Sequence, residues 1–179
     1  KLRQFGYDGK GVQVIRNEAD LTKLFEEPSL VEDLVDIEKE LSVIVTKGSR
    51  GEIVCFDAVE MEFNPIANLV EFLICPSTIT DQQATTCTNL AKQVIEAFDI
   101  CGLLAVELFL TKSGEVLVNE VAPRPHNRGH HSIEACYTSQ YQQHLRSILD
   151  LPLGSTGLKM PAVMVNVLGE ANHTGSAKY

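Results

Sequence analysis

The sequence lacks the features that mark several broad classes of protein. None of its apolar runs is long enough to cross a bilayer, so we expect no membrane span. It has no lysine-rich run, and its net charge of −9 argues against nucleic acid or an anionic membrane as the main partner. No internal repeat and no low-complexity tract is present. With 179 residues, 44% of them hydrophobic, one compact domain or most of one is expected.

The five cysteines do not have the spacing of a disulfide framework or of a zinc site. Their number is odd, and no two of them are arranged as CxxC. Free thiols persist in the reducing cytosol, whereas disulfide scaffolds belong to oxidising compartments. We therefore expect a cytoplasmic protein whose thiols are reduced and buried, at Cys55, Cys75, Cys87, Cys101 and Cys136.

Short apolar segments, several of them alternating, recur along the chain and predict more strands than helices. Two amphipathic helices are predicted to pack on these strands, so the expected fold class is α+β. A short helix capped by Asn17 is expected as well. The predicted strands cover residues 12–16, 51–63, 67–77 and 161–169, with two strands around an acidic bend within 29–47 and a hairpin over 102–120.

The two amphipathic helices are predicted from their caps and from their apolar spacing. Thr80 and Gln83 have the spacing of a capping box at the start of residues 80–100. Ser139 and Gln142 repeat that spacing before the second helix. The faces expected to be buried are Ala84, Cys87, Ala91, Val94, Ile95 and Phe98 on the first helix, and Tyr141, Leu145 and Ile148 on the second.

The hairpin carries two acidic residues in otherwise apolar strands. If its turn is centred on Ser113 and Gly114, Glu107 lies opposite Glu120 and both point to one face. Two buried carboxylates do not readily ionise together unless a cation lies between them. Oxygen ligands with open positions suit magnesium bound to substrate phosphates. The alternative is that both acids lie on a solvated face, or that the register differs by one or two residues.

Two other segments fit a nucleotide site only in combination with this hairpin. "GYDGKG", residues 6–11, is either a loose turn or a flap whose N–H groups and Lys10 cover phosphates. "VEDLVDIEKE", residues 31–40, is either an acidic surface bend or the lining of an adenine slot. The glycine-rich segment is neither a Walker A sequence nor a GxGxxG that precedes a helix.

In this order, the pieces resemble an ATP-grasp enzyme with antiparallel-rich sheets and packed helices. More narrowly, "GYDGKG" followed by "NEVAPRPHNRGH" resembles the 5-(carboxyamino)imidazole ribonucleotide synthetase family of purine biosynthesis. The resemblance extends over nearly the whole chain. It implies a carbon–nitrogen ligase that uses ATP, magnesium, bicarbonate and 5-aminoimidazole ribonucleotide, and that forms a homodimer when full length.

The resemblance also implies roles for individual residues. Pro123 and Pro125 would keep the chain extended after the second acidic strand, so that the side chains between and after them project into an anion-binding cavity. A guanidinium there would hold planar bicarbonate in a bidentate manner. For the nucleotide, the implied roles are phosphate contact for Lys1, a phosphate-covering flap for Gly6, Tyr7, Asp8, Gly9, Lys10 and Gly11, adenine binding for Glu32, Asp33, Leu34 and Val35, and ribose contact for Glu40. For magnesium, the implied ligands are Glu107 and Glu120, with Asn119 beside them. Contact with bicarbonate and the ribonucleotide is implied for Arg124, His126 and Asn127, with Tyr7 and Asp8 near the ribonucleotide.

Some positions depart from the family pattern. Val12 stands where the loop usually continues with Gln, Arg128 replaces a small residue, and Asn64 falls near a family His. His130 and His131 are expected to help begin the next helix, without a catalytic role. Since Lys1 is not a methionine, we expect a fragment that lacks the family's N-terminal domain, with an ATP-grasp domain over 1–160 and the start of a strand-rich C-terminal region over 161–179.

Two other functions remain open at this point. The chain could belong to another ATP-grasp carboxylate–amine ligase, such as a biotin-carboxylase-like or a formate-dependent purine enzyme, although the "HNRGH" string disfavours both. It could also be a non-catalytic nucleotide-binding module, because the fragment alone is expected to be inactive.

Overall fold

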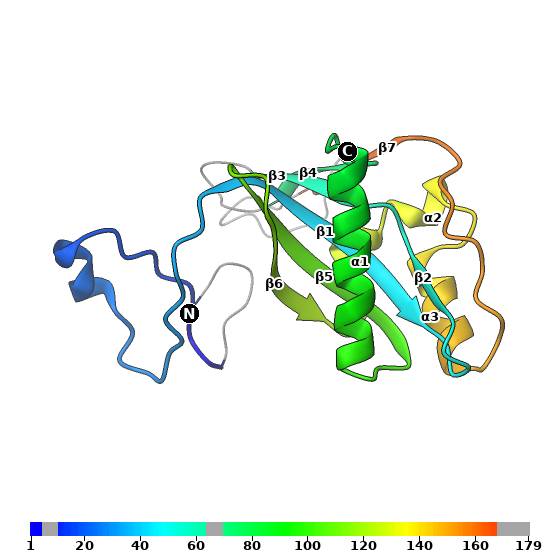
Figure 1. Ribbon diagram of the computed structural model, residues 1–179, viewed down its shortest axis with the longest axis horizontal. Coiled ribbons are helices and arrows are strands. Elements are labelled where there is room, and N and C mark those ends of the chain that lie inside the picture. The colour runs from blue at the N-terminus through cyan, green and yellow to red at the C-terminus, as the bar shows by residue number, and fades with distance from the viewer. Residues whose placement is uncertain (5–10, 64–69, 168–179) are drawn as a thin grey trace, which may run out of the picture.

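The fold is built on one antiparallel sheet. The computed structural model describes residues 1–4, 11–63 and 70–167, and in these ranges seven strands pair in the order β6-β5-β1-β3-β4-β7, with β2 added to β1. Figure 1 shows the helices packed on this sheet, which confirms the α+β prediction. The strands are β1 (Ile37–Lys47), β2 (Ile53–Cys55), β3 (Val59–Phe63), β4 (Val70–Cys75), β5 (Gly102–Thr111), β6 (Val116–Ala122) and β7 (Ala162–Val165).

Helix α1 (Asp81–Ala97) covers one face of the sheet (Figure 1). It begins with the predicted capping box, since the Thr80 side chain accepts from the Gln83 N–H and the Gln83 side chain accepts from the Thr80 N–H. Its buried residues pack on alternate side chains of β1 and β5, and each fully buried Leu, Ile or Val in this core contributes about 2 kcal/mol. This core contains Cys87, Ala91 and Ile95 of α1, Leu41, Val43 and Val45 of β1, and Leu104, Val106, Leu108 and Leu110 of β5. Phe98, expected in this core, is 60% exposed because it follows the last turn of the helix.

The opposite face of β1 and β5 is covered by the segment that follows β6. This segment contains the 3-10 turn η2 (Asn127–Gly129), α2 (Ser132–Ala135) and α3 (Gln140–Ile148). A second core lies beneath it, formed by Ile44, Phe56, Leu103, Ala105 and Cys136. The expected capping box of Ser139 and Gln142 is present at the start of α3.

The expected orientation of α3 is wrong. Tyr141, Leu145 and Ile148, predicted to be buried, are 40%, 53% and 52% exposed. The helix instead buries its polar residues Gln140, Gln143 and Ser147. The reason is that both glutamine side chains bond to the backbone of neighbouring loops, so polar burial there is compensated by hydrogen bonds.

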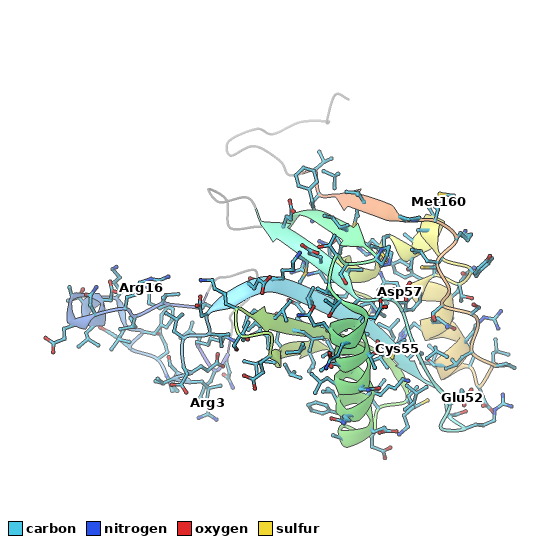
Figure 2. The ribbon with its side chains drawn as sticks, turned by 45° about the horizontal axis from the view of Figure 1, so that its top comes forward. Arg3, Arg16, Glu52, Cys55, Asp57 and Met160 are labelled. Carbon is cyan, nitrogen blue, oxygen red and sulfur yellow. The ribbon has the colours of Figure 1, made fainter. Side chains whose placement is uncertain are left out.

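The N-terminal segment differs most from the sequence expectations. Residues 12–16 form no strand, and Asn17 caps the 3-10 helix η1 (Glu18–Lys23) instead of an α-helix. Only one strand, β1, forms within 29–47, and the acidic stretch before it is extended and exposed. Arg3 and Arg16 mark this segment in Figure 2, where it lies away from the sheet.

The predicted strand over 51–63 is interrupted. Its first part, β2, pairs with the end of β1 at Val45–Lys47, and its second part, β3, pairs with Glu40–Ser42. The link between them contains Phe56, which is 2% exposed and whose N–H donates to the Ile44 carbonyl. The link between the two strands therefore packs into the core on the far face of β1 from α1.

The remaining expectations concern the thiols, membrane spans and the C-terminal boundary. All five cysteines are free, but Cys101 is exposed; burial raises the pKa of Cys87 to about 11 and that of Cys75 to about 12. None of the helices described is long and apolar enough to cross a membrane. β7 pairs with β4 and so extends the same sheet. The domain division at residue 160 and the cytoplasmic location stay predictions.

Candidate functional site

The hairpin of β5 and β6 brings two glutamates together as predicted. Glu107 lies directly opposite Glu120. On the turn side of this pair the register is shifted by one residue, so that Leu108 faces Val118 and Phe109 faces Leu117. The turn is therefore centred on Ser113, and a bulge at Asn119 restores the expected pair. The predicted register was wrong between the bulge and the turn, but the predicted glutamate pair is confirmed.

The two glutamates have different environments. Glu107 is 8% exposed, and burial raises the pKa of its carboxyl group, with Arg128 opposing the rise and Glu120 adding to it. Glu120 is exposed, so only one carboxylate of the expected pair is buried. The Glu107 carboxylate is therefore enclosed by the fold, whereas the Glu120 carboxylate is accessible from outside.

Glu40 belongs to the same group of acids. Ser42 pairs with Glu107 across β1 and β5, and Glu40, two residues earlier, points to the same face of the sheet. Burial raises the pKa of Glu40, and repulsion from Glu107 and Glu120 raises it further. Three carboxylates therefore share one face of the sheet, the face that also carries the second core.

Cationic and imidazole groups lie beside these acids. His126 Nε2 is 3.5 Å from Glu107 Oε1, and Arg128 Nη2 is 3.6 Å from Glu107 Oε2. Arg124 is exposed, and its charge also lowers the pKa of Glu107. In the sequence, Arg128 stood out only as a departure from the family pattern, and its contact with Glu107 was not predicted. Such a contact depends on the path of a loop, which spacing alone does not indicate.

The loop after β6 holds these groups in place. The His126 side chain accepts from the Arg128 N–H at 3.5 Å and so caps η2. Asn127 donates from Nδ2 to Asn166 Oδ1 at 3.2 Å, which ties the loop to the segment after β7. His130 and His131 lie immediately before α2, as expected, and the His130 ring stacks on Tyr141.

Lys1 joins two other predicted residues that are distant in sequence. Its Nζ donates to Asn119 Oδ1 at 3.0 Å and lies 2.9 Å from Glu32 Oε2. The bulge residue beside Glu120 is thereby connected to the acidic segment expected to line an adenine slot. Within that segment Glu32, Asp33 and Leu34 are exposed and Val35 is partly buried.

Several predicted residues lie outside the described part of the chain. These are Gly6, Tyr7, Asp8, Gly9 and Lys10 of the flap, and Asn64. Gly11 is described, and its φ of 84° requires the left-handed region that favours glycine.

The acids fit a divalent cation by their chemistry. Glu107 and Glu120 offer carboxylate oxygens from opposite strands, and a bound cation would favour the ionised form of Glu107, whose pKa is raised first by burial. Among residues 1–4, 11–63 and 70–167, no group of three or more His, Cys, Asp or Glu side chains is close enough to hold a metal by itself.

Comparison with known proteins places these residues in a family. Residues 1–141 match the model of the ATP-grasp domain. The N5-carboxyaminoimidazole ribonucleotide synthase of Bacillus subtilis is 42% identical over 92% of this chain and 44% of that protein. The chain spans less than half the length of the curated relatives it matches.

Solved structures agree with this match. The N5-carboxyaminoimidazole ribonucleotide synthetase of Thermotoga maritima has a TM-score of 0.83 and 47% identity, over 92% of this chain and 44% of that one. The N5-carboxyaminoimidazole synthase of Aspergillus clavatus, in complex with ADP and 5-aminoimidazole ribonucleotide, has a TM-score of 0.79 and 33% identity, over 86% and 41% of the two chains.

Proposed function

The chain belongs to the ATP-grasp family, and we propose that the complete protein carboxylates the exocyclic amine of 5-aminoimidazole ribonucleotide, using ATP and bicarbonate. The observation that carries this proposal is the pair Glu107 and Glu120, followed directly by the segment with Arg124, His126 and Asn127. The relatives named for this reaction, and one solved in complex with ADP and the ribonucleotide, support it.

ATP would bind over the face that carries the three acids. Glu107 and Glu120 would hold magnesium, which supplies positive charge to the transferring phosphate when bound. Lys1 and the flap residues 6–11 would contact phosphates, residues 32–35 the adenine and Glu40 the ribose. Asn119 connects two of these parts, because it accepts a hydrogen bond from Lys1 beside Glu120.

The remaining residues would act on bicarbonate and the ribonucleotide. The Arg124 guanidinium orients bicarbonate, whose oxygen forms a bond to the γ-phosphorus of ATP while the bond to the departing ADP breaks. The carboxyphosphate then releases inorganic phosphate and carbon dioxide. The exocyclic amine bonds to that carbon and gives up one proton to His126, which suits the task because histidine titrates near neutral pH. Asn127, and Tyr7 and Asp8 of the flap, would position the ribonucleotide.

Product formation by the complete protein tests the proposal. With ATP, bicarbonate and 5-aminoimidazole ribonucleotide, the wild type should form the carbamate and one phosphate per turnover. Glu120→Ala should abolish this activity, whereas Glu115→Ala, on the turn of the same hairpin, should retain it. An unchanged rate in Glu120→Ala would remove that residue from the mechanism. Turnover with formate and none with bicarbonate would indicate a different ATP-grasp ligase.

The isolated chain is a separate case. Since it spans less than half of its relatives, we expect weak or no ATP binding and no turnover, and a homodimer only for the complete protein. Calorimetric titration with magnesium and a non-hydrolysable ATP analogue tests the binding part.

A further inference from the structure

The buried glutamine Gln140, at the start of α3, bonds to both backbone polar groups of His126. Its Oε1 accepts from the His126 N–H at 2.9 Å, and its Nε2 donates to the His126 carbonyl at 2.8 Å. The same Nε2 lies 2.9 Å from His130 Nδ1. Gln140 is 0% exposed, so these bonds have no water to replace them.

The bonds to Gln140 fix the loop from both ends. The Gln140 N–H donates to Ser132 Oγ at 2.9 Å, and Ser132 Oγ donates to the Gly129 carbonyl at 2.5 Å. A methyl group at Gly129 would lie 2.6 Å from Gln140 Cδ, so only glycine leaves room for this side chain. The segment between His126 and Ser132 is thus clamped by one helix residue.

His126 is the residue whose ring this clamp orients. With its backbone fixed, its ring accepts from the Arg128 N–H on the Nδ1 side and directs Nε2 toward Glu107. In the reaction proposed above, Glu107 would bind magnesium, and His126 Nε2 lies 3.5 Å from Glu107 Oε1. A shift of about 1 Å at such a group is sufficient to slow catalysis about 100-fold.

We infer that Gln140 is a positioning residue that sets the orientation of His126 for the ribonucleotide half of the reaction. This inference rests on the proposed function. It explains why α3 buries a glutamine and exposes Tyr141 and Leu145. Gln140 contacts no substrate in this account and acts only through His126.

The chain provides a matched control in Gln143, one turn further along α3. Gln143 is also 0% exposed and makes the same two-point bond, with Nε2 donating to the Gly154 carbonyl at 2.6 Å and Oε1 accepting from the Gly154 N–H at 2.8 Å. Its partner loop carries none of the proposed site residues. Each methionine variant therefore leaves one peptide N–H and one carbonyl without its side-chain partner, but only Gln140→Met acts on His126 and also loses the contact with His130.

The experiment compares these variants in the complete protein. We expect Gln140→Met to lower kcat for carbamate formation about 10- to 100-fold while the KM for ATP changes less than about twofold. Gln143→Met should lose similar thermal stability but keep kcat within about twofold of the wild type. Equal kcat losses in both variants, or an unchanged kcat in Gln140→Met, would overturn the inference.

Two further measurements keep the result decisive. If Gln140→Met does not fold, Gly129→Ala replaces it, because its methyl group displaces the same side chain. The NMR signal of the His126 Cε1–H should move in Gln140→Met or Gly129→Ala and stay in place in Gln143→Met; a signal unmoved in all three contradicts the inference. A wild type without turnover would overturn the proposed function instead, and the NMR comparison would then decide the inference alone.

Discussion

Glu120 lies opposite Glu107 because the chain forms a bulge at the residue before it. On the turn side of this pair, the register of β6 is shifted by one residue, so that Leu108 pairs with Val118 and Asn119 has no partner on β5. The bulge also turns the Asn119 side chain to Lys1 Nζ, 3.0 Å away. One irregularity therefore sets both the facing acids and the link to the N-terminal segment.

Asn119→Ala should weaken nucleotide binding and leave the fold intact. It removes the hydrogen bond from Lys1, and a bond to a charged group contributes about 1.5–3 kcal/mol. The KM for ATP of the complete protein should rise about tenfold, measured by phosphate release. Asn119→Asp keeps an acceptor for Lys1 and serves as the control. An unchanged KM in the alanine variant would show that Lys1 and Asn119 do not act together.

Glu107→Gln should stabilise the protein at neutral pH when magnesium is removed. The folded-state pKa of Glu107 is raised above its ordinary 4.5, first by burial, so folding favours the protonated carboxyl. Its stability contribution is full below that ordinary value and is lost as pH rises through the raised pKa. Thermal melts with a chelator should give a higher Tm for the variant at pH 7 and equal Tm values near pH 4. A Tm difference that does not change with pH would contradict this assignment.

Arg128→Ser should destabilise the metal-free protein. The guanidinium is 3.6 Å from Glu107 and lowers the pKa of both Glu107 and Glu40. Its loss should reduce the free energy of unfolding by about 1–3 kcal/mol in urea titrations without metal. Magnesium with ADP should restore most of that stability, since in the proposed site the cation would take over the neutralisation of Glu107. Equal losses with and without magnesium and ADP would indicate that Arg128 only packs.

Thr78→Val should destabilise the opposite face of the sheet in a pH-dependent manner. Burial alone would raise the pKa of Glu60, but bonds from Lys39 and from Thr78 outweigh it and lower that pKa. The Glu60 carboxylate accepts from Thr78 Oγ1 at 2.7 Å and from the Thr78 N–H at 3.0 Å. Stability from this group is present above 4.5 and is lost as pH falls through the lowered pKa.

Urea unfolding measures this effect. The valine variant should be less stable than the wild type by about 1–3 kcal/mol at neutral pH, and the difference should shrink below about pH 4. Thr85→Val provides a control, because the Thr85 hydroxyl donates only to a carbonyl one turn earlier in α1. A loss of stability of the same size at both pH values would show that the contribution of Thr78 does not depend on the ionisation of Glu60.

Features set by local chemistry were predictable from the sequence. The capping boxes before α1 and α3 are complete within four residues, so the two residues that form each box could be identified from their spacing. The glutamate pair was predicted correctly, although the turn and the bulge each displaced the register by one residue and the two displacements cancelled.

Features that depend on loop paths were not predictable from spacing. The apolar positions of α3 indicated a buried face, but hydrogen bonds from Gln140 and Gln143 to the loops before and after this helix decide which side of it is covered. The contact of Arg128 with Glu107 depends on the extended exit after β6 and the turn η2. In both cases a polar side chain contacts a residue in another element or loop, and the spacing of apolar residues does not predict such a contact.

The most direct test of the facing glutamates is a manganese titration of the complete protein with ADP, followed by electron paramagnetic resonance. Manganese takes the same oxygen ligands as magnesium. Glu107→Gln and Glu120→Gln should each weaken manganese binding at least about tenfold, while Glu115→Gln should bind as the wild type does. Equal manganese affinity in all four proteins would contradict the account, because the two acids would then hold no cation.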